Sequence, residues 1–253
     1  MIEGQIEVDG YKTGNTVHRY DLDKLRSRHK ILAEYKYTKR GVIRGYANRT
    51  LYVNLSSNTI KEKPVTEEMK KKFTGGRGFG LKLLWDTLKP TTRWDSEENE
   101  IVITTGPLCG TTQYPGSGKS LCLSVSPSTG IICDCNVGGF FGPYLKFSGF
   151  DALEIQGKAS KDVVIFIDGE KGCVSIESAP LEDVNSHILN EQLTYLYADD
   201  SSPHSLQKVS VVSSGKGAEH SYWGCLNFSF YDIRRRVARM KQAGRGGLGT
   251  VFR

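Results

Sequence analysis

Glycine is unusually frequent in this sequence and gathers in four short segments. The chain holds 28 glycines among 253 residues, well above the average of about 7% for globular proteins. The segments are residues 75–78, 116–119, 136–139 and 244–249, and each contains or adjoins a cation or an amide. Glycine allows backbone conformations and close approaches that a Cβ atom forbids. The composition therefore excludes collagen, a disordered chain and a coiled coil, and it predicts many tight turns.

Length and hydropathy place the chain among globular proteins. A chain of 253 residues forms one large domain or two small ones and can bury a substantial core. It contains neither an apolar run long enough for a membrane span nor a signal-peptide pattern at its start, so we expect a cytoplasmic protein. Its six cysteines predict reduced thiols, because Cys133 and Cys135 stand closer than the usual spacing of paired metal ligands.

The positive charge is unevenly distributed. The net charge is +6, and residues 1–45 contribute +4 of it, with 10 basic and 6 acidic residues. The rest of the chain is nearly neutral, so we predict a basic N-terminal extension at residues 1–45 and one domain at residues 46–253. Such an extension is typical of a solvated helix face or a docking arm, and we expect neither a nucleic-acid partner nor a membrane span.

Periodicity predicts more strands than helices, most of them joined as hairpins. This pattern favours an α+β fold over a βαβ fold. Helices are predicted at residues 21–35, 66–73, 81–88 and 185–197. Strands are predicted at residues 50–55, 60–64, 101–105, 121–126, 131–135, 151–156, 163–168, 173–177, 209–213 and 228–230.

Familiar catalytic motifs are incomplete. The segment 114–120 ends like a phosphate-binding P-loop, but Gln113 replaces the first glycine and a strand follows instead of a helix. Residues 76–80 lack the glycine spacing of a dinucleotide fingerprint. His220 beside Glu219 is the one candidate acid/base pair, and the sequence favours a surface turn as its explanation. Each glycine segment alone is compatible with a structural turn, whereas the four together indicate one large, anionic ligand held at several points.

The order of five segments resembles the N-terminal domain of the tungsten-containing aldehyde ferredoxin oxidoreductase family. The resemblance covers residues 46–253, and its most specific block is Gly-Gly-Phe-Phe-Gly-Pro-Tyr-Leu-Lys-Phe-Ser-Gly-Phe-Asp at residues 138–151. The matching segments are residues 75–78, 103–111, 125–130, 136–151 and 243–249.

The resemblance implies a fold and a cofactor. The fold would be two intertwined β-sheets related by a pseudo-dyad, with a few packed helices, that carry a tungsten bis-pyranopterin cofactor. Main-chain carbonyls of Asn136 and Gln242 would hold a magnesium ion that bridges the pterin phosphates. Lys119 would lie between the pterin and an iron–sulfur cluster, where the family usually has Arg, and Lys lacks the planar fork of Arg. The expected cofactor contacts are Gly76, Arg77, Gly78, Lys119, Asn136, Gly138, Gly139, Gln242, Gly244, Arg245, Gly246 and Gly247.

Family enzymes continue beyond this domain into two helical domains that supply the ligands of a [4Fe–4S] cluster and the substrate-side residues. The resemblance therefore implies the pterin-binding N-terminal subunit or module of a split aldehyde:ferredoxin oxidoreductase, with no catalytic acid or base of its own. Its expected partners are a second subunit with the C-terminal domains and a ferredoxin. Two alternatives stay open: the same cofactor base in an aromatic acyl-CoA reductase, and a non-catalytic scaffold.

Overall fold

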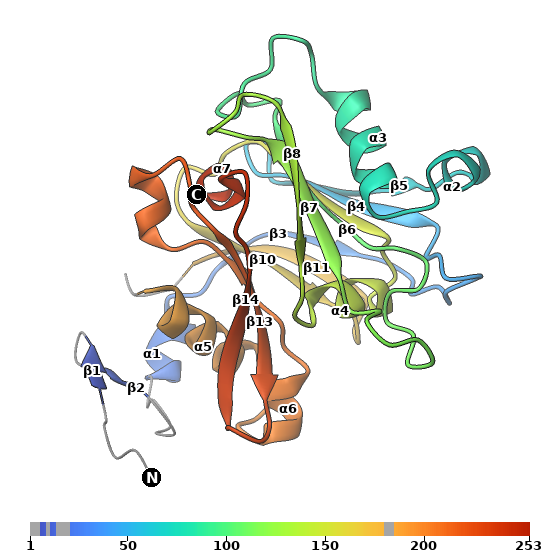
Figure 1. Ribbon diagram of the computed structural model, residues 1–253. Coiled ribbons are helices and arrows are strands. Elements are labelled where there is room, and N and C mark those ends of the chain that lie inside the picture. The colour runs from blue at the N-terminus through green and yellow to red at the C-terminus, as the bar shows by residue number, and fades with distance from the viewer. Residues whose placement is uncertain (1–5, 9–10, 14–20, 180–184) are drawn as a thin grey trace.

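The computed structural model describes residues 6–8, 11–13, 21–179 and 185–253, which form a mixed α+β structure (Figure 1). A six-stranded sheet has the strand order β5-β4-β9-β6-β7-β8, and two three-stranded sheets have the orders β10-β11-β3 and β12-β13-β14. A short hairpin pairs β1 with β2. The predicted α+β class is therefore confirmed.

The strands of the six-stranded sheet are β4 (Arg49–Asn54), β5 (Thr59–Pro64), β6 (Glu100–Thr104), β7 (Ser120–Val125), β8 (Ile132–Val137) and β9 (Ala152–Gln156). The other strands are β1 (Ile6–Val8), β2 (Tyr11–Thr13), β3 (Ile31–Lys36), β10 (Val163–Asp168), β11 (Cys173–Ser178), β12 (Val212–Ser213), β13 (Leu226–Asp232) and β14 (Val237–Ala243). The helices are α1 (Leu22–Ser27), α2 (Glu67–Phe73), α3 (Arg77–Thr87), α4 (Phe141–Phe147), α5 (Ser186–Tyr197), α6 (Pro203–Gln207), α7 (Leu248–Phe252) and the 3₁₀ helix η1 (Lys216–His220).

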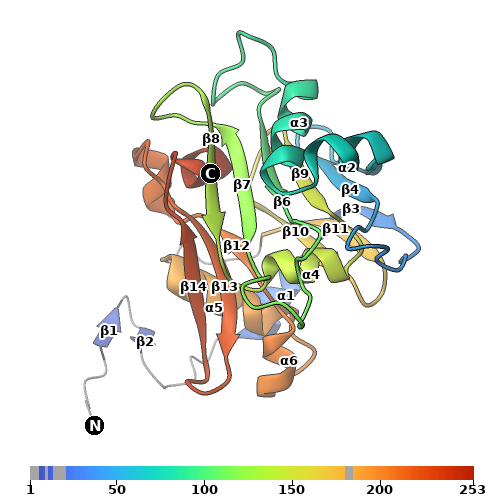
Figure 2. The same ribbon diagram turned by 45° about the vertical axis from the view of Figure 1, so that its right-hand side comes forward.

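The six-stranded sheet is buried on both faces. Helices α2 and α3 cover one face, where Phe79 and Leu84 pack against Val102 and Leu123 (Figure 2). The main core lies on the other face and includes Phe228 of β13. Two layers of apolar packing thus hold β6 and β7 in place, and β8 at the edge of the sheet is positioned through β7.

A buried ion pair explains part of the family-like block at residues 138–151. Lys146 and Asp151 form a salt bridge, with side chains only 2% and 0% exposed. Asp151 also accepts hydrogen bonds from the backbone N–H groups of Ala47 and Asn48, and Lys146 donates to the carbonyl of Gly45. Partners on every side offset the desolvation of the two charges. The pair therefore fastens residues 45–48 to the end of α4.

The helix predicted at residues 21–35 is wrong in its second half. Asp21 caps α1 by accepting a hydrogen bond from the Lys24 N–H, but the helix ends at Ser27. Residues 31–36 instead form β3, which pairs with the open edge of β11 and packs Ala33 against the main core. Pairing with an existing strand outweighs the weak helical spacing of the segment. These residues belong to the sheet, although they lie in the segment predicted as an extension, part of which falls outside the described residues.

Other differences concern short elements. The strand predicted at residues 209–213 is reduced to β12. The elements that were not predicted are β1, β2, α4, α6, η1, β14 and α7. The remaining predicted helices and strands are present within a few residues of their expected ends. All six cysteines are free thiols, as expected.

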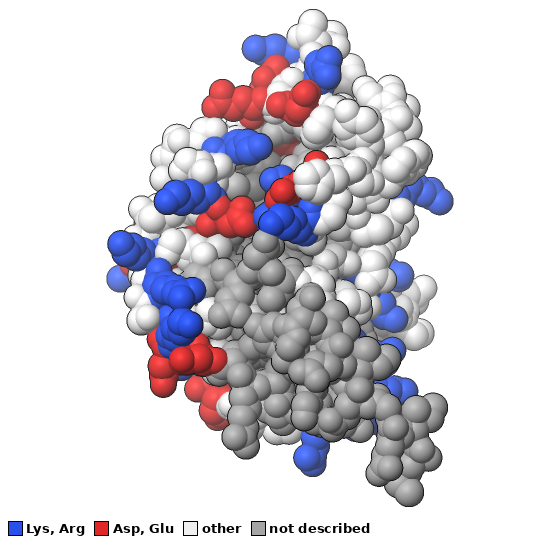
Figure 3. Space-filling view, turned by 90° about the vertical axis from the view of Figure 1, so that its left-hand side faces the viewer, with Lys and Arg blue, Asp and Glu red and all other residues white. Residues whose placement is uncertain are grey.

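Charges on one face of the molecule are mixed in sign. Figure 3 shows Lys and Arg side chains beside Asp and Glu side chains on the face that lies at the left of Figure 1. Within the described part of the segment predicted as a basic extension, Arg26 pairs with Asp23 and Lys36 pairs with Glu34. Among the described residues, none of the helices has the length and apolar character needed to cross a membrane.

Candidate functional site

The four glycine segments meet along β8, the edge strand of the large sheet. Arg77, in the first segment, reaches Asp134 of β8. A Cβ atom built on Gly118, in the second, would lie 3.9 Å from the carbonyl oxygen of Gly139, in the third. A Cβ atom on Gly246, in the fourth, would lie 2.5 Å from Sγ of Cys133 in β8. The structure thus brings together segments that the sequence separates by up to 170 residues.

The first segment forms the start of α3. Gly76 has φ +52°, its N–H donates to the carbonyl of Thr105, and its own carbonyl accepts from the Thr104 hydroxyl. Arg77 donates from Nε and Nη2 to Oδ2 of Asp134, over 2.9 and 2.7 Å. A side chain on Gly78 would collide with the carbonyl of Phe73. The structure thus gives Gly76 and Gly78 packing roles and commits Arg77 to a carboxylate.

The third segment leaves the end of β8. Asn136 is exposed and lies opposite Leu121 of β7. Gly138 lies beside β14, where an added Cβ atom would be 3.4 Å from Cγ of Lys241. Gly139 has φ +94°, and its Cβ position faces the carbonyls of Phe228 and Ser229 at 3.3 Å. The positive φ of Gly139 and its close packing against β13 therefore favour glycine at this position.

The fourth segment links β14 to α7. Gln242 is exposed and lies opposite Asn227, and Gly244 and Arg245 follow it at the surface. Gly246 and Gly247 adopt φ +74° and +64°, so the chain turns sharply against β8 before α7 begins. Arg245 is close enough to Cys133 to lower the pKa of that thiol, although burial and the neighbouring Asp134 raise it overall. Within the described residues, Arg245 has no ion-pair partner.

The second segment precedes β7. Lys119 is exposed, and its side chain has no hydrogen-bond or ion-pair partner among the described residues. The next residue, Ser120, is buried, and its hydroxyl has no partner in the described part of the chain. The start of β7 therefore has an exposed, unpaired cation, followed by a buried hydroxyl that has no partner in the described part of the chain.

Two residues of the site were missed by sequence reasoning. Lys241 lies between the third and fourth segments, next to Gly138 and with Nζ 5.8 Å from the ring centroid of Phe230. Asp134 neutralises Arg77. The alternation of exposed residues along β14 could have indicated Lys241, but that strand was not predicted. The pairing of Arg77 with Asp134 left no signal in the sequence.

The site fits an anionic ligand with several charged groups. Lys119, Lys241 and Arg245 surround β8 with exposed cations that no carboxylate in the described residues neutralises. Asp134, the acidic residue of β8, is already paired. Glycine-rich backbone lets a ligand approach closely, and cations bind phosphate groups. Across residues 21–179 and 185–253, no three His, Cys, Asp or Glu side chains gather as a metal site.

Several known proteins are similar to this chain. The model of the aldehyde ferredoxin oxidoreductase N-terminal domain family matches residues 50–253. The tungsten-containing aldehyde ferredoxin oxidoreductase of Pyrococcus horikoshii is 36% identical over 208 residues, which are 82% of this chain and 32% of that protein. The aliphatic sulfonate oxidoreductase WOR-like subunit of Pyrococcus furiosus is 36% identical over 224 residues, and the match covers 82% of this chain and 32% of that protein.

A solved structure is similar as well. The active-site complex of benzoyl coenzyme A reductase with 1,5 dienoyl-CoA matches with a TM-score of 0.66 and 25% identity, over 82% of this chain and 29% of that chain. This chain spans about a third of the length of the relatives it matches. The match begins at Thr50 and includes all four glycine segments. The chain therefore belongs to the aldehyde ferredoxin oxidoreductase family and corresponds to its N-terminal domain.

Proposed function

We propose that this chain is the pterin-binding N-terminal subunit or module of a split tungsten-dependent aldehyde:ferredoxin oxidoreductase. The observation that carries the proposal is the meeting of four glycine segments at β8, with Lys119, Lys241 and Arg245 exposed and unpaired around it. A bis-pyranopterin carries phosphate groups that need several cations at once. A chance cluster of structural turns would not require the cations to converge.

Each part of the site has a role in this proposal. Arg245 and Lys241 would bind pterin phosphates, and Lys119 would supply further positive charge to the bound cofactor. The main-chain carbonyls of Asn136 and Gln242 would hold a magnesium ion. Gly139, Gly246 and Gly247 allow the tight turns that bring these segments against the rest of the fold, and Gly138 and Gly244 leave the neighbouring backbone free of side chains where the cofactor would approach. Asp134 holds Arg77 in place, so Arg77 helps to position β8. The charge of Arg77 also neutralises the carboxylate of Asp134, which would otherwise repel the phosphates.

The bound tungsten cofactor would supply the two-electron oxidation of an aldehyde with water to a carboxylic acid, with electrons leaving to ferredoxin through a [4Fe–4S] cluster. The substrate-side residues and the cluster ligands belong to the part of the family that this chain does not span. We therefore assign this chain the tasks of binding, orienting and electrostatically tuning the cofactor, in a cytoplasmic complex with a partner that carries the C-terminal domains.

A second candidate uses the same site in the reduction of an aromatic acyl-CoA thioester. The likeness to the benzoyl coenzyme A reductase complex favours it. The residues that select the substrate would again lie on the partner, so the cofactor contacts proposed here are the same for both candidates.

The test is the metal and pterin content of the complex. The tagged chain is purified without oxygen from its native host, and tungsten, molybdenum, iron and pterin are measured together with the identity of the co-purifying polypeptide. Arg245→Ala should lower pterin and tungsten retention, whereas Arg234→Ala, at the exposed tip between β13 and β14, should leave both unchanged. Absence of tungsten, molybdenum and pterin from the wild-type complex would refute the proposal.

A further inference from the structure

A group of large apolar side chains is exposed at one end of the molecule, next to the candidate cofactor site. Trp223 is 72% exposed, Ile131 is 68% exposed and Tyr222 is 58% exposed. Ile132, at the start of β8, is also exposed. Gly130 and Tyr222 line one pocket, and Ile131 and Trp223 directly follow them in the chain, so these exposed residues lie close together. Single exposed apolar residues are common, but a group of this kind marks an interaction surface. We call these four residues the apolar patch.

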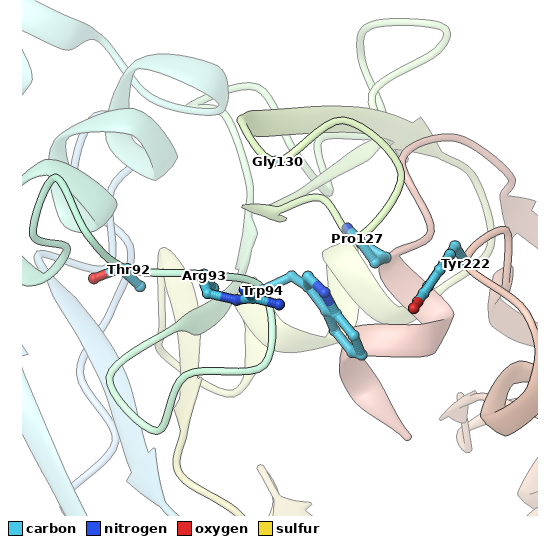
Figure 4. A pocket seen from close by; sticks show the side chains of 6 residues that line it. All are labelled: Thr92, Arg93, Trp94, Pro127, Gly130 and Tyr222. Carbon is cyan, nitrogen blue, oxygen red and sulfur yellow. The ribbon is translucent and has the colours of Figure 1, made fainter.

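A shallow pocket lies beside the apolar patch (Figure 4). Its volume is about 380 Å³, and it is lined by Thr92, Arg93, Trp94, Pro127, Gly130 and Tyr222. The rings of Trp94 and Tyr222 meet edge to face, with centroids 5.7 Å apart. Arg93 is already paired with Asp95. Aromatic walls with no unpaired charge are suited to an apolar anchor residue of another protein surface.

The apolar patch is continuous with the glycine loop of the candidate cofactor site. A Cβ atom on Gly247 would lie 2.7 Å from Cγ of Pro127 and would collide with the carbonyl of Tyr222. Ile132 directly precedes Cys133, against which Gly246 packs. A surface that covers the apolar patch therefore also closes one side of the cofactor site and excludes water from it.

We propose that the apolar patch and its pocket are the docking surface for the polypeptide that carries the C-terminal part of the family. The inference rests on the proposed function, because it names the contact surface of the partner assumed there. The matched relatives are about three times as long as the matched segment, so a large amount of protein surface is available to cover the patch. The contact is apolar, since the exposed side chains at its centre carry no charge.

The test compares two exposed tryptophans in the holo-complex. Trp223→Ala removes the most exposed member of the apolar patch, and Trp85→Ala removes a tryptophan that is 81% exposed on α3. Both variants are purified from the native host like the wild type. The co-purifying polypeptide is identified by mass spectrometry and quantified after dilution and gel filtration. Truncation of an interface hot spot costs about 2 kcal/mol or more, which is about thirtyfold in affinity. Trp223→Ala should therefore weaken retention of the C-terminal polypeptide about thirtyfold or more, and Trp85→Ala should leave it unchanged.

The outcomes separate the two proposals. Ile131→Ser, in the turn between β7 and β8, serves as a second variant and should also release the partner if Trp223→Ala fails to fold. Retention of the partner by both patch variants, in a wild-type complex that holds tungsten and pterin, overturns the docking surface and leaves the proposed function standing. Dimers of this chain that dissociate in Trp223→Ala would show that the patch binds a second copy, and would also overturn the inference.

Discussion

Glu100 gives a prediction about stability that depends only on the described residues. Its side chain is 1% exposed, and neither carboxylate oxygen has a hydrogen-bond partner in the described part of the chain. Burial, and after it the negative charge of Glu154, raise the pKa of Glu100 from 4.5 to about 7, against the attraction of Lys63. Glu154 itself is buried and accepts hydrogen bonds from Thr50 and Lys63. Glu100 therefore keeps its proton to a higher pH than an ordinary carboxyl group does.

The sign of the pH effect follows from this shift. A carboxyl group with a higher pKa in the folded state stabilises the fold fully below pH 4.5, and the contribution is lost as the pH rises through about 7. At about 1.4 kcal/mol per pKa unit, the loss amounts to about 3 kcal/mol. In Glu100→Gln, a neutral amide of similar shape takes the place of the protonated acid. The variant should lose this part of the pH dependence and be more stable than the wild type at pH 8.

The assay is thermal unfolding followed by tryptophan fluorescence at pH 4.5 and pH 8. For a chain of this size, 3 kcal/mol corresponds to a shift of about 6–12 °C in Tm. The difference between the two pH values should therefore be smaller in Glu100→Gln than in the wild type by about that amount. Glu97→Gln, at an exposed position, is the control and should behave like the wild type. Equal pH dependence in Glu100→Gln and the wild type would refute the reasoning.

Further predictions concern the ion pairs and the glycine loop. Lys146→Met should cost about 3–5 kcal/mol in unfolding free energy, because it leaves the buried carboxylate of Asp151 without its charged partner; a loss below 1 kcal/mol in chemical denaturation would contradict this. Arg77→Ala should reduce pterin retention by exposing the charge of Asp134, and adding Asp134→Asn should restore it; equal losses in the single and double variants would show that Arg77 binds the cofactor directly. Gly246→Ala should destabilise the fold by about 1–3 kcal/mol more than Gly116→Ala. Both glycines have a positive φ, but the added Cβ atom collides with Cys133 at position 246 and meets open space at position 116. Equal denaturation midpoints in the two glycine variants would contradict the collision with Cys133 as the cause of the destabilisation.

Much of the fold could be predicted from periodicity and turn residues. The hairpin of β4 and β5 and the cap of α2 by Thr66 follow from local sequence, and the structure has both. The second half of the segment 21–35 could not be predicted, because its conformation depends on pairing with β11, whose residues lie about 140 positions later. Local propensity has no information on such a distant partner.

The sequence predicted the glycine segments of the candidate site, but it did not predict how the charged side chains are paired there. The clustering of glycine pointed to all four segments that meet at β8. The sequence could not indicate that Arg77 is neutralised by Asp134, because this contact depends on where the start of α3 lies against β8. It could not indicate that Lys241 lies against Gly138 either, because this contact depends on how β8 and β14 are placed side by side. The assignment of cofactor contacts to these residues stays a prediction.

The pairing of β4 with β9 has a consequence for synthesis of the chain. These strands are parallel, and the hydroxyl of Thr50 bonds to Glu154, which is 104 positions away in the sequence. At a translation rate of about 5–20 residues per second, β9 is synthesised roughly 5 to 20 s after β4. During this time its buried residues Leu51 and Val53 have only β5 beside them, so a truncated chain that ends before β9 retains an apolar strand with an open edge.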